Sequence, residues 1–141
     1  MNNQKYLIIK NGTVITPEQE IKDGVVIIQN EKIIEVGKRG EIEEPENAEI
    51  IDAQNSYISP GLIDIHVNGA NGADVSKIDS DTFSTMGKFF AKYGVTSYVG
   101  TTITAAPTDI IKALQFARKY LKDIKIDCAE LWGIHMEGPY I

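Results

Sequence analysis

Two short motifs bring together side chains that can bind a metal ion. In each, a second polar residue stands two positions after a histidine: Asn68 after His66, and Glu137 after His135. Residues two apart in a strand point to the same face, so each pair projects from one side of its strand. Imidazole and carboxylate groups suit zinc or ferrous iron, and such an ion with an open coordination position activates water for the hydrolysis of an amide.

These residues also have a plainer interpretation. A single histidine at the end of a strand is more often a hydrogen-bonded structural residue than a metal ligand. Glu137 is harder to explain in this way, because a carboxylate beside an apolar strand is costly unless it is paired or bound to a cation. Spacing alone leaves the metal site and the structural role equally open.

The residues around the motifs carry weaker signals. Gly138 allows a close backbone approach to a ligand, although turn geometry explains a glycine equally well. Asp64 lies on the same face of its strand as His66, where it supports a ligand or caps a helix. The threonines within residues 101–104 are expected to satisfy backbone groups of a loop, and Trp132 is expected in the core.

The motifs need strands to carry them, and the second part of the sequence alternates strand and helix signals. Compact apolar runs predict the strands, and apolar residues at helical spacing predict the helices. The predicted strands cover residues 62–67, 95–99 and 130–136, and the helices cover about 79–93 and 107–122. Gly94 ends the first helix, and Pro107 starts the second. The β-α-β-α-β order implies parallel strands with their carboxyl ends at one edge.

The first part of the sequence predicts a small antiparallel sheet. Short β-branched runs alternate with turn signals, and Asn11-Gly12 and Asn30-Glu31 each predict the turn of a hairpin. A sheet of about fifty residues is near the lower size limit for folding alone. We therefore expect it to rest on another part of the protein.

Composition excludes several classes of function. The 141 residues are 43% hydrophobic and 24% charged, as in soluble globular proteins. No apolar run approaches the roughly 18 residues that cross a bilayer, and no secretory signal is recognisable, so we expect a cytoplasmic protein without a membrane partner. A formal charge of −6 without clustered Lys and Arg argues against nucleic acid as a partner.

The predicted strands do not close a barrel. A (β/α)8 barrel takes about 250 residues, and the sequence ends at Ile141, directly after the third strand and its loop. That strand would be left with an uncovered edge, which stable proteins usually avoid. We expect a truncated barrel, and the alternative is a small open α/β domain in its own right.

Three runs of residues resemble a known family. The run SPGLIDIH at residues 59–66 resembles the start of the barrel in the amidohydrolase superfamily. The runs VNGANGAD at 67–74 and GIHMEGPYI at 133–141 are similar to N-acetylglucosamine-6-phosphate deacetylases in particular. The resemblance implies an α/β metal-dependent hydrolase: residues 1–58 are the N-terminal part of a small antiparallel β-sandwich domain, and residues 59–141 are the first β-α-β-α-β units of a truncated TIM barrel.

The resemblance also implies an activity and a site. The activity is metal-assisted hydrolysis of the acetamide of N-acetylglucosamine-6-phosphate, giving glucosamine-6-phosphate and acetate in amino-sugar metabolism. Glu137 matches the family's glutamate ligand to a divalent metal, zinc or iron. The further assignments are His66 and Asn68 to the metal, Gly138 to the substrate, and His135 and Asp64 to support of the ligands.

The remaining machinery of the family lies on later strands of the barrel. It comprises further histidine ligands and an aspartate that acts as general base, so we expect no catalytic residue within this chain and no activity of the chain alone. Most amidohydrolases have His-x-His on the first strand, where this chain has His66 and Asn68. The full-length protein is expected to be a homodimer or homotetramer. The alternatives are a dihydroorotase, hydantoinase or adenine deaminase, or a non-catalytic fragment whose barrel edge pairs with another chain.

Overall fold

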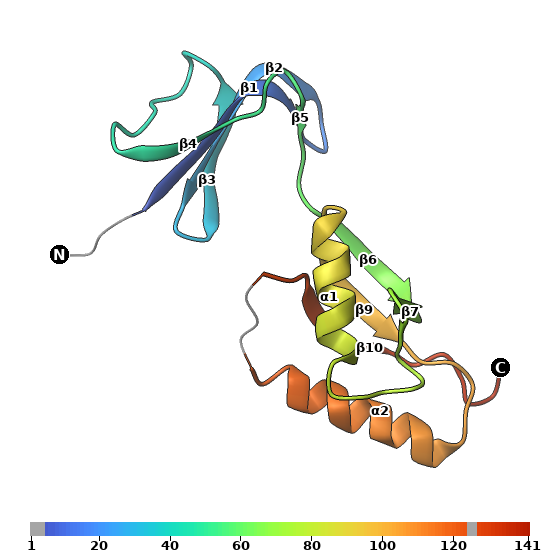
Figure 1. The fold of residues 1–141 in the computed structure, drawn as a ribbon. Coiled ribbons are helices and arrows are strands. Elements are labelled where there is room, and N and C mark those ends of the chain that lie inside the picture. Colours follow the sequence, from blue (N-terminus) through green and yellow to red (C-terminus); the bar gives the residue numbers. More distant parts are fainter. Residues whose placement is uncertain (1–4, 124–126) are drawn as a thin grey trace. The chain divides into compact units, whose positions relative to one another are not determined.

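The chain divides into two compact units, one up to Pro60 and one from Gly61. The computed structural model describes residues 5–123 and 127–141. Within these residues, the first unit consists of strands and the second combines strands with two helices (Figure 1).

One five-stranded sheet forms the first unit. Its strands are β1 (Tyr6–Ile15), β2 (Glu20–Gln29), β3 (Lys32–Lys38), β4 (Ala48–Asp52) and β5 (Tyr57–Ile58). The order is β3-β2-β1-β4, with β5 also paired to β1. The β1–β2 and β2–β3 pairs are antiparallel, but β4 and β5 run parallel to β1. The sheet is therefore mixed, where the sequence predicted a purely antiparallel one, because the chain returns along β1 after a long loop.

Asn11-Gly12 does not form a hairpin turn, so that prediction was wrong. β1 continues through both residues, and Asn11 has a φ of 61°. The β1–β2 register shifts between Ile9 and Gly12, which marks a β-bulge. A Cβ on Gly12 would lie 2.5 Å from the Ser56 carbonyl oxygen, so this position requires glycine. The second predicted hairpin is confirmed, with Gln29 opposite Lys32 across the turn.

The second unit has the predicted alternation of strands and helices. Its elements are β6 (Leu62–Val67), β7 (Gly69–Ala70), β8 (Ala73–Asp74), α1 (Thr82–Lys92), β9 (Val95–Thr101), α2 (Pro107–Tyr120) and β10 (Glu130–His135). β6, β9 and β10 form a parallel sheet in the order β10-β9-β6. β7 and β8 form a small additional hairpin that the sequence reading did not predict.

Local sequence explains where the helices begin and end. Gly94 has a φ of 81° just after α1, a conformation that stops a helix. α1 begins three residues later than predicted, at Thr82, whose hydroxyl donates to the Asp79 carboxylate at 3.0 Å. The backbone N–H of Asp81 and this hydroxyl both lower the pKa of Asp79. α2 begins at Pro107, as predicted.

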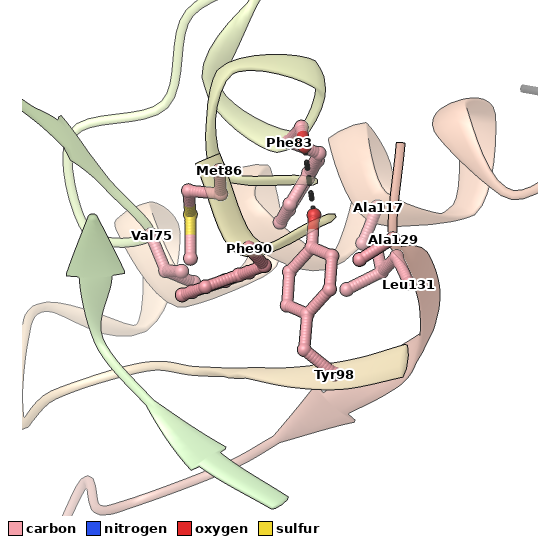
Figure 2. Packing of buried hydrophobic residues seen from close by; sticks show 8 residues of the cluster. All are labelled: Val75, Phe83, Met86, Phe90, Tyr98, Ala117, Ala129 and Leu131. Carbon is pink, nitrogen blue, oxygen red and sulfur yellow. Dashed lines mark hydrogen bonds between the residues drawn. The ribbon is translucent and has the colours of Figure 1, made fainter. Parts of the chain in front are cut away.

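Tyr98 lies at the centre of the core of the second unit (Figure 2). The buried residues of this core are Val75, Phe83, Met86, Phe90, Tyr98, Ala117, Ala129 and Leu131. The Tyr98 hydroxyl donates to the Phe83 carbonyl at 2.8 Å, so β9 and α1 are joined by a buried hydrogen bond as well as by packing. Burial raises the pKa of Tyr98, which keeps the phenol protonated as a donor.

Several apolar side chains of the second sheet remain exposed. Ile63 and Ile65 on β6 are 50% and 70% exposed, and Trp132 on β10 is 53% exposed, so the prediction of a core tryptophan was wrong. Trp132 instead donates its indole N–H to Glu130 on the same strand at 3.1 Å. Within the described residues, neither helix is long and apolar enough to span a bilayer.

Substituting Met86 tests the contribution of this core. Met86→Ala should lower the free energy of unfolding of the full-length protein by about 2–5 kcal/mol, because it leaves a cavity at a fully buried position. Lys88→Ala on the exposed side of the same helix is the matched control and should have almost no effect. Urea denaturation measures both, and equal effects would contradict the described packing.

Candidate active site

The candidate site lies where the three parallel strands of the second unit end. His66 is the penultimate residue of β6, Thr101 is the last of β9, and His135 is the last of β10. β9 pairs in parallel with both of the other strands, so their carboxyl ends meet at one edge of the sheet (Figure 1). Parallel α/β folds characteristically carry their functional residues at this edge.

Three of the predicted site residues come together there. The His66 Nε2 atom lies 3.3 Å from the Glu137 Oε2 atom. The rings of His66 and His135 make an edge contact, with centroids 4.9 Å apart and planes at 80°. The side chains of His66 and Glu137 are 48% and 38% exposed, so an ion or ligand can reach both.

Asn68 and Asp64 both form hydrogen bonds with backbone groups. The Asn68 amide nitrogen donates to the Thr101 carbonyl at 3.2 Å, which ties the segment after β6 to the end of β9. The Asp64 carboxylate accepts the His66 backbone N–H at 3.1 Å. Asp64 therefore acts on the backbone that carries the imidazole, and Asn68 has its amide oriented by the neighbouring strand.

Gly138 occupies a position that only glycine accepts without strain. Its φ is 99°, and a Cβ at this residue would lie 2.8 Å from the Thr104 hydroxyl and 3.0 Å from the Thr104 Cα. The Thr104 hydroxyl in turn donates to the Ile141 carbonyl at 3.1 Å. The segment after Glu137 thus packs closely on the loop after β9, which fixes the path of the backbone beside Glu137.

The donor atoms fit part of a metal site. An imidazole nitrogen and a carboxylate oxygen at this separation suit a divalent cation such as zinc or iron. Among residues 5–123 and 127–141, no three His, Cys, Asp or Glu side chains are arranged as a metal-binding group. His66 and Glu137 would therefore be two of the ligands, and a complete site needs others.

The β7–β8 hairpin is a part of this edge that sequence reasoning missed. It follows Asn68 directly, and the Val75 backbone N–H donates to the Asn68 carbonyl at 2.8 Å, which closes the hairpin. Asn71 and Gly72 form its turn with φ values of 53° and 83°. An Asn-Gly pair was the available signal, but the flanking strands are only two residues long.

Comparisons with known proteins agree with the fold. The chain is 36% identical over 137 residues to an N-acetylglucosamine-6-phosphate deacetylase of Bacillus subtilis, covering 96% of the chain and 34% of that protein. The crystal structure of the deacetylase of the same name from Pasteurella multocida superposes with a TM-score of 0.85 at 28% identity, covering 96% of this chain and 35% of that one. No family model matches.

A relative with a different name also matches. The chain is 34% identical over 142 residues to a dihydroorotase of Lactococcus lactis, covering 96% of the chain and 31% of that protein. The chain spans about a third of the length of each curated relative that it matches here.

The fold is that of the N-terminal part of amidohydrolase-superfamily proteins, and the predicted fold class is confirmed by the structural match. Within this class, the resemblance to the N-acetylglucosamine-6-phosphate deacetylase family is confirmed: the chain is a relative of those enzymes over almost its whole length.

Replacing Gly138 tests the geometry next to Glu137. Gly138→Ala should lower the free energy of unfolding by about 1–3 kcal/mol, because alanine is strained at this positive φ and meets Thr104. Gly133→Ala in β10 is the matched control, since a Cβ there has open space within 4 Å. Thermal unfolding of the full-length variants measures both changes in stability. A Gly138→Ala protein as stable as wild type would refute this backbone geometry.

Proposed function

We propose that the full-length protein to which this chain belongs is an N-acetylglucosamine-6-phosphate deacetylase. It would hydrolyse the acetamide with one water molecule, and the products are glucosamine-6-phosphate and acetate. The observation that carries the proposal is the 3.3 Å approach of His66 Nε2 to Glu137 Oε2 across the edge of the sheet. Similarity to deacetylases over almost the entire chain supports the choice of substrate.

A divalent metal ion, zinc or iron, is part of this proposal. Glu137 and His66 would hold it, and Asn68 is a further candidate because its amide is already oriented at the same edge. When bound, the metal polarises the acetamide carbonyl and lowers the pKa of water. The other ligands, and the aspartate that transfers the proton, would come from residues outside this chain.

The chain's own residues would mainly position the reactants. Asp64 fixes the backbone of His66, and His135 supports the His66 imidazole through the edge contact of their rings. Gly138 lets the backbone beside Glu137 pack closely on Thr104, and its peptide groups would contact the sugar substrate. Orientation of this kind supplies much of the rate enhancement when the chemistry itself is simple.

Dihydroorotase is the second candidate, because one of the matched relatives carries that name. Asn68 stands against it, since that class of amidohydrolase usually has a second histidine at this position of the first strand. The substrate distinguishes the two: acetate release from the amino-sugar phosphate supports the proposed function, whereas hydrolysis of dihydroorotate without acetate release would replace it. The cytoplasmic location and the homodimer or homotetramer stay predictions.

Glu137→Gln should reduce acetate release by at least about a hundredfold, since loss of a metal ligand costs no less than loss of a residue that orients one. The amide keeps the shape of the side chain but removes the charge that attracts the cation. Glu130→Gln is the matched control, because Glu130 is an exposed glutamate at the start of β10, away from the candidate site. Equal activity of the two variants would show that Glu137 is not a metal ligand.

Chelation provides an independent test of the metal. Dialysis of the full-length protein against a chelator should abolish acetate release, and addition of zinc or ferrous ion should restore it, because the ion supplies the electrophile. The restored rate with each ion identifies the metal that the site uses best. Full activity in a chelated sample that contains no metal by elemental analysis would contradict the metal-assisted reaction.

A further inference from the structure

Thr101 links both outer strands of the parallel sheet at the candidate site. It is the last residue of β9, it is completely buried, and it pairs with His135 of β10. On the other side its hydroxyl accepts the N–H of Val67, the last residue of β6, and its carbonyl accepts the amide of Asn68, the next residue. The uncharged side chain of Thr101 therefore lies between β6 and β10, the two strands that carry His66 and His135.

The β6–β9 ladder is irregular beside His66. Asp64 pairs with Tyr98, and the next pair is Val67 with Gly100, so β6 contains one more residue than β9 in this stretch. An irregularity of this kind disturbs the regular backbone hydrogen bonds. The Val67 N–H donates to the Thr101 hydroxyl at 3.1 Å, so a side chain supplies an acceptor at this bulge.

Two further bonds extend this arrangement. The Asn68 amide nitrogen donates to the Thr101 carbonyl at 3.2 Å. The N–H of the next residue, Thr102, donates to the His135 carbonyl at 3.0 Å. The backbone on both sides of the His66–Glu137 pair is thus held by two adjacent threonines.

We propose that Thr101 is a positioning residue of the candidate site, whose hydroxyl fixes the end of β6 so that His66 faces Glu137. The inference rests on the proposed function for its catalytic consequence, but its geometric part concerns only the His66–Glu137 pair. The hydroxyl acts through the Val67 N–H, which adjoins His66 in the chain. Loss of this bond lets the bulge relax, and the imidazole moves relative to the carboxylate.

The chain offers matched variants that separate this role from packing. Thr101→Val keeps the shape of the side chain and removes the hydroxyl, whereas Thr101→Ser keeps the hydroxyl and removes the methyl group. Thr96→Val removes a hydroxyl from the other end of the same strand, where Thr96 donates to the Leu62 carbonyl at 3.4 Å. Thr96 thus joins the same two strands away from the site.

Cobalt(II) provides a spectroscopic probe of the site in the full-length protein. Thr101→Val should weaken Co²⁺ binding by about tenfold or more and change its visible absorption spectrum, as loss of a residue that orients ligands does. The turnover rate for acetate release should fall by a similar factor, with a Michaelis constant within about threefold of wild type. Thr101→Ser and Thr96→Val should retain the wild-type spectrum and affinity.

Two results would overturn the inference. One is a Thr101→Val protein with the Co²⁺ affinity and spectrum of wild type, and the other is a Thr101→Ser protein as impaired as Thr101→Val, which would assign the effect to packing. If Thr101→Val does not fold, hydrogen exchange of the wild-type protein tests the bond between the Val67 N–H and the Thr101 hydroxyl instead. The Val67 amide should be protected as strongly as the amides of β9, and exchange at the rate of an open loop would refute the bond.

The two readouts also separate this inference from the proposed function. A wild-type protein that binds Co²⁺ but releases no acetate refutes the deacetylase activity, and the spectra of the variants still test Thr101. A wild-type protein that releases acetate, with Thr101→Val unchanged in both rate and spectrum, refutes only the role of Thr101.

Discussion

Parallel pairing of β9 with both of its neighbours is the interaction on which the second unit depends. Because all three strands run in the same direction, the residues at their carboxyl ends share one edge. This brings His66, from the start of the unit, against Glu137, from its end. Neither residue has a local reason to meet the other, so the contact depends on strand register and on the packing of the segment after β10 against Thr104.

The core supports this register from the helical side. Tyr98 is buried in the middle of β9 and is bonded to the Phe83 carbonyl of α1, so β9 is held in one position along its axis. Thr101 follows three residues later on the same strand and contacts the end of β6. The core around Tyr98 is therefore connected to the site by one short strand, β9. This strand is held in place because both of its edges are paired.

Bulges show how one sequence signal can serve two structures. Asn11-Gly12 has the positive φ preference of a hairpin turn, but in β1 it forms a bulge within a long strand. The local conformation at Asn11 was within reach of prediction, because Asn and Gly tolerate that region whatever surrounds them. Whether this conformation makes a turn or a bulge depended on the pairing of β1 with β2 beyond Asn11, and on the close approach of Ser56 to Gly12.

The sequence by itself determined the elements of the second unit, the edge that carries the two histidine motifs, and the resemblance to amidohydrolases. These follow from periodicity and from residues close together in the chain. Only the tertiary structure decided that Glu137 reaches His66, that Asn68 directs its amide to Thr101, that β4 runs parallel to β1, and that Trp132 is exposed. Such contacts depend on the register between strands, and register is set by packing across the whole unit, which short-range preferences do not encode.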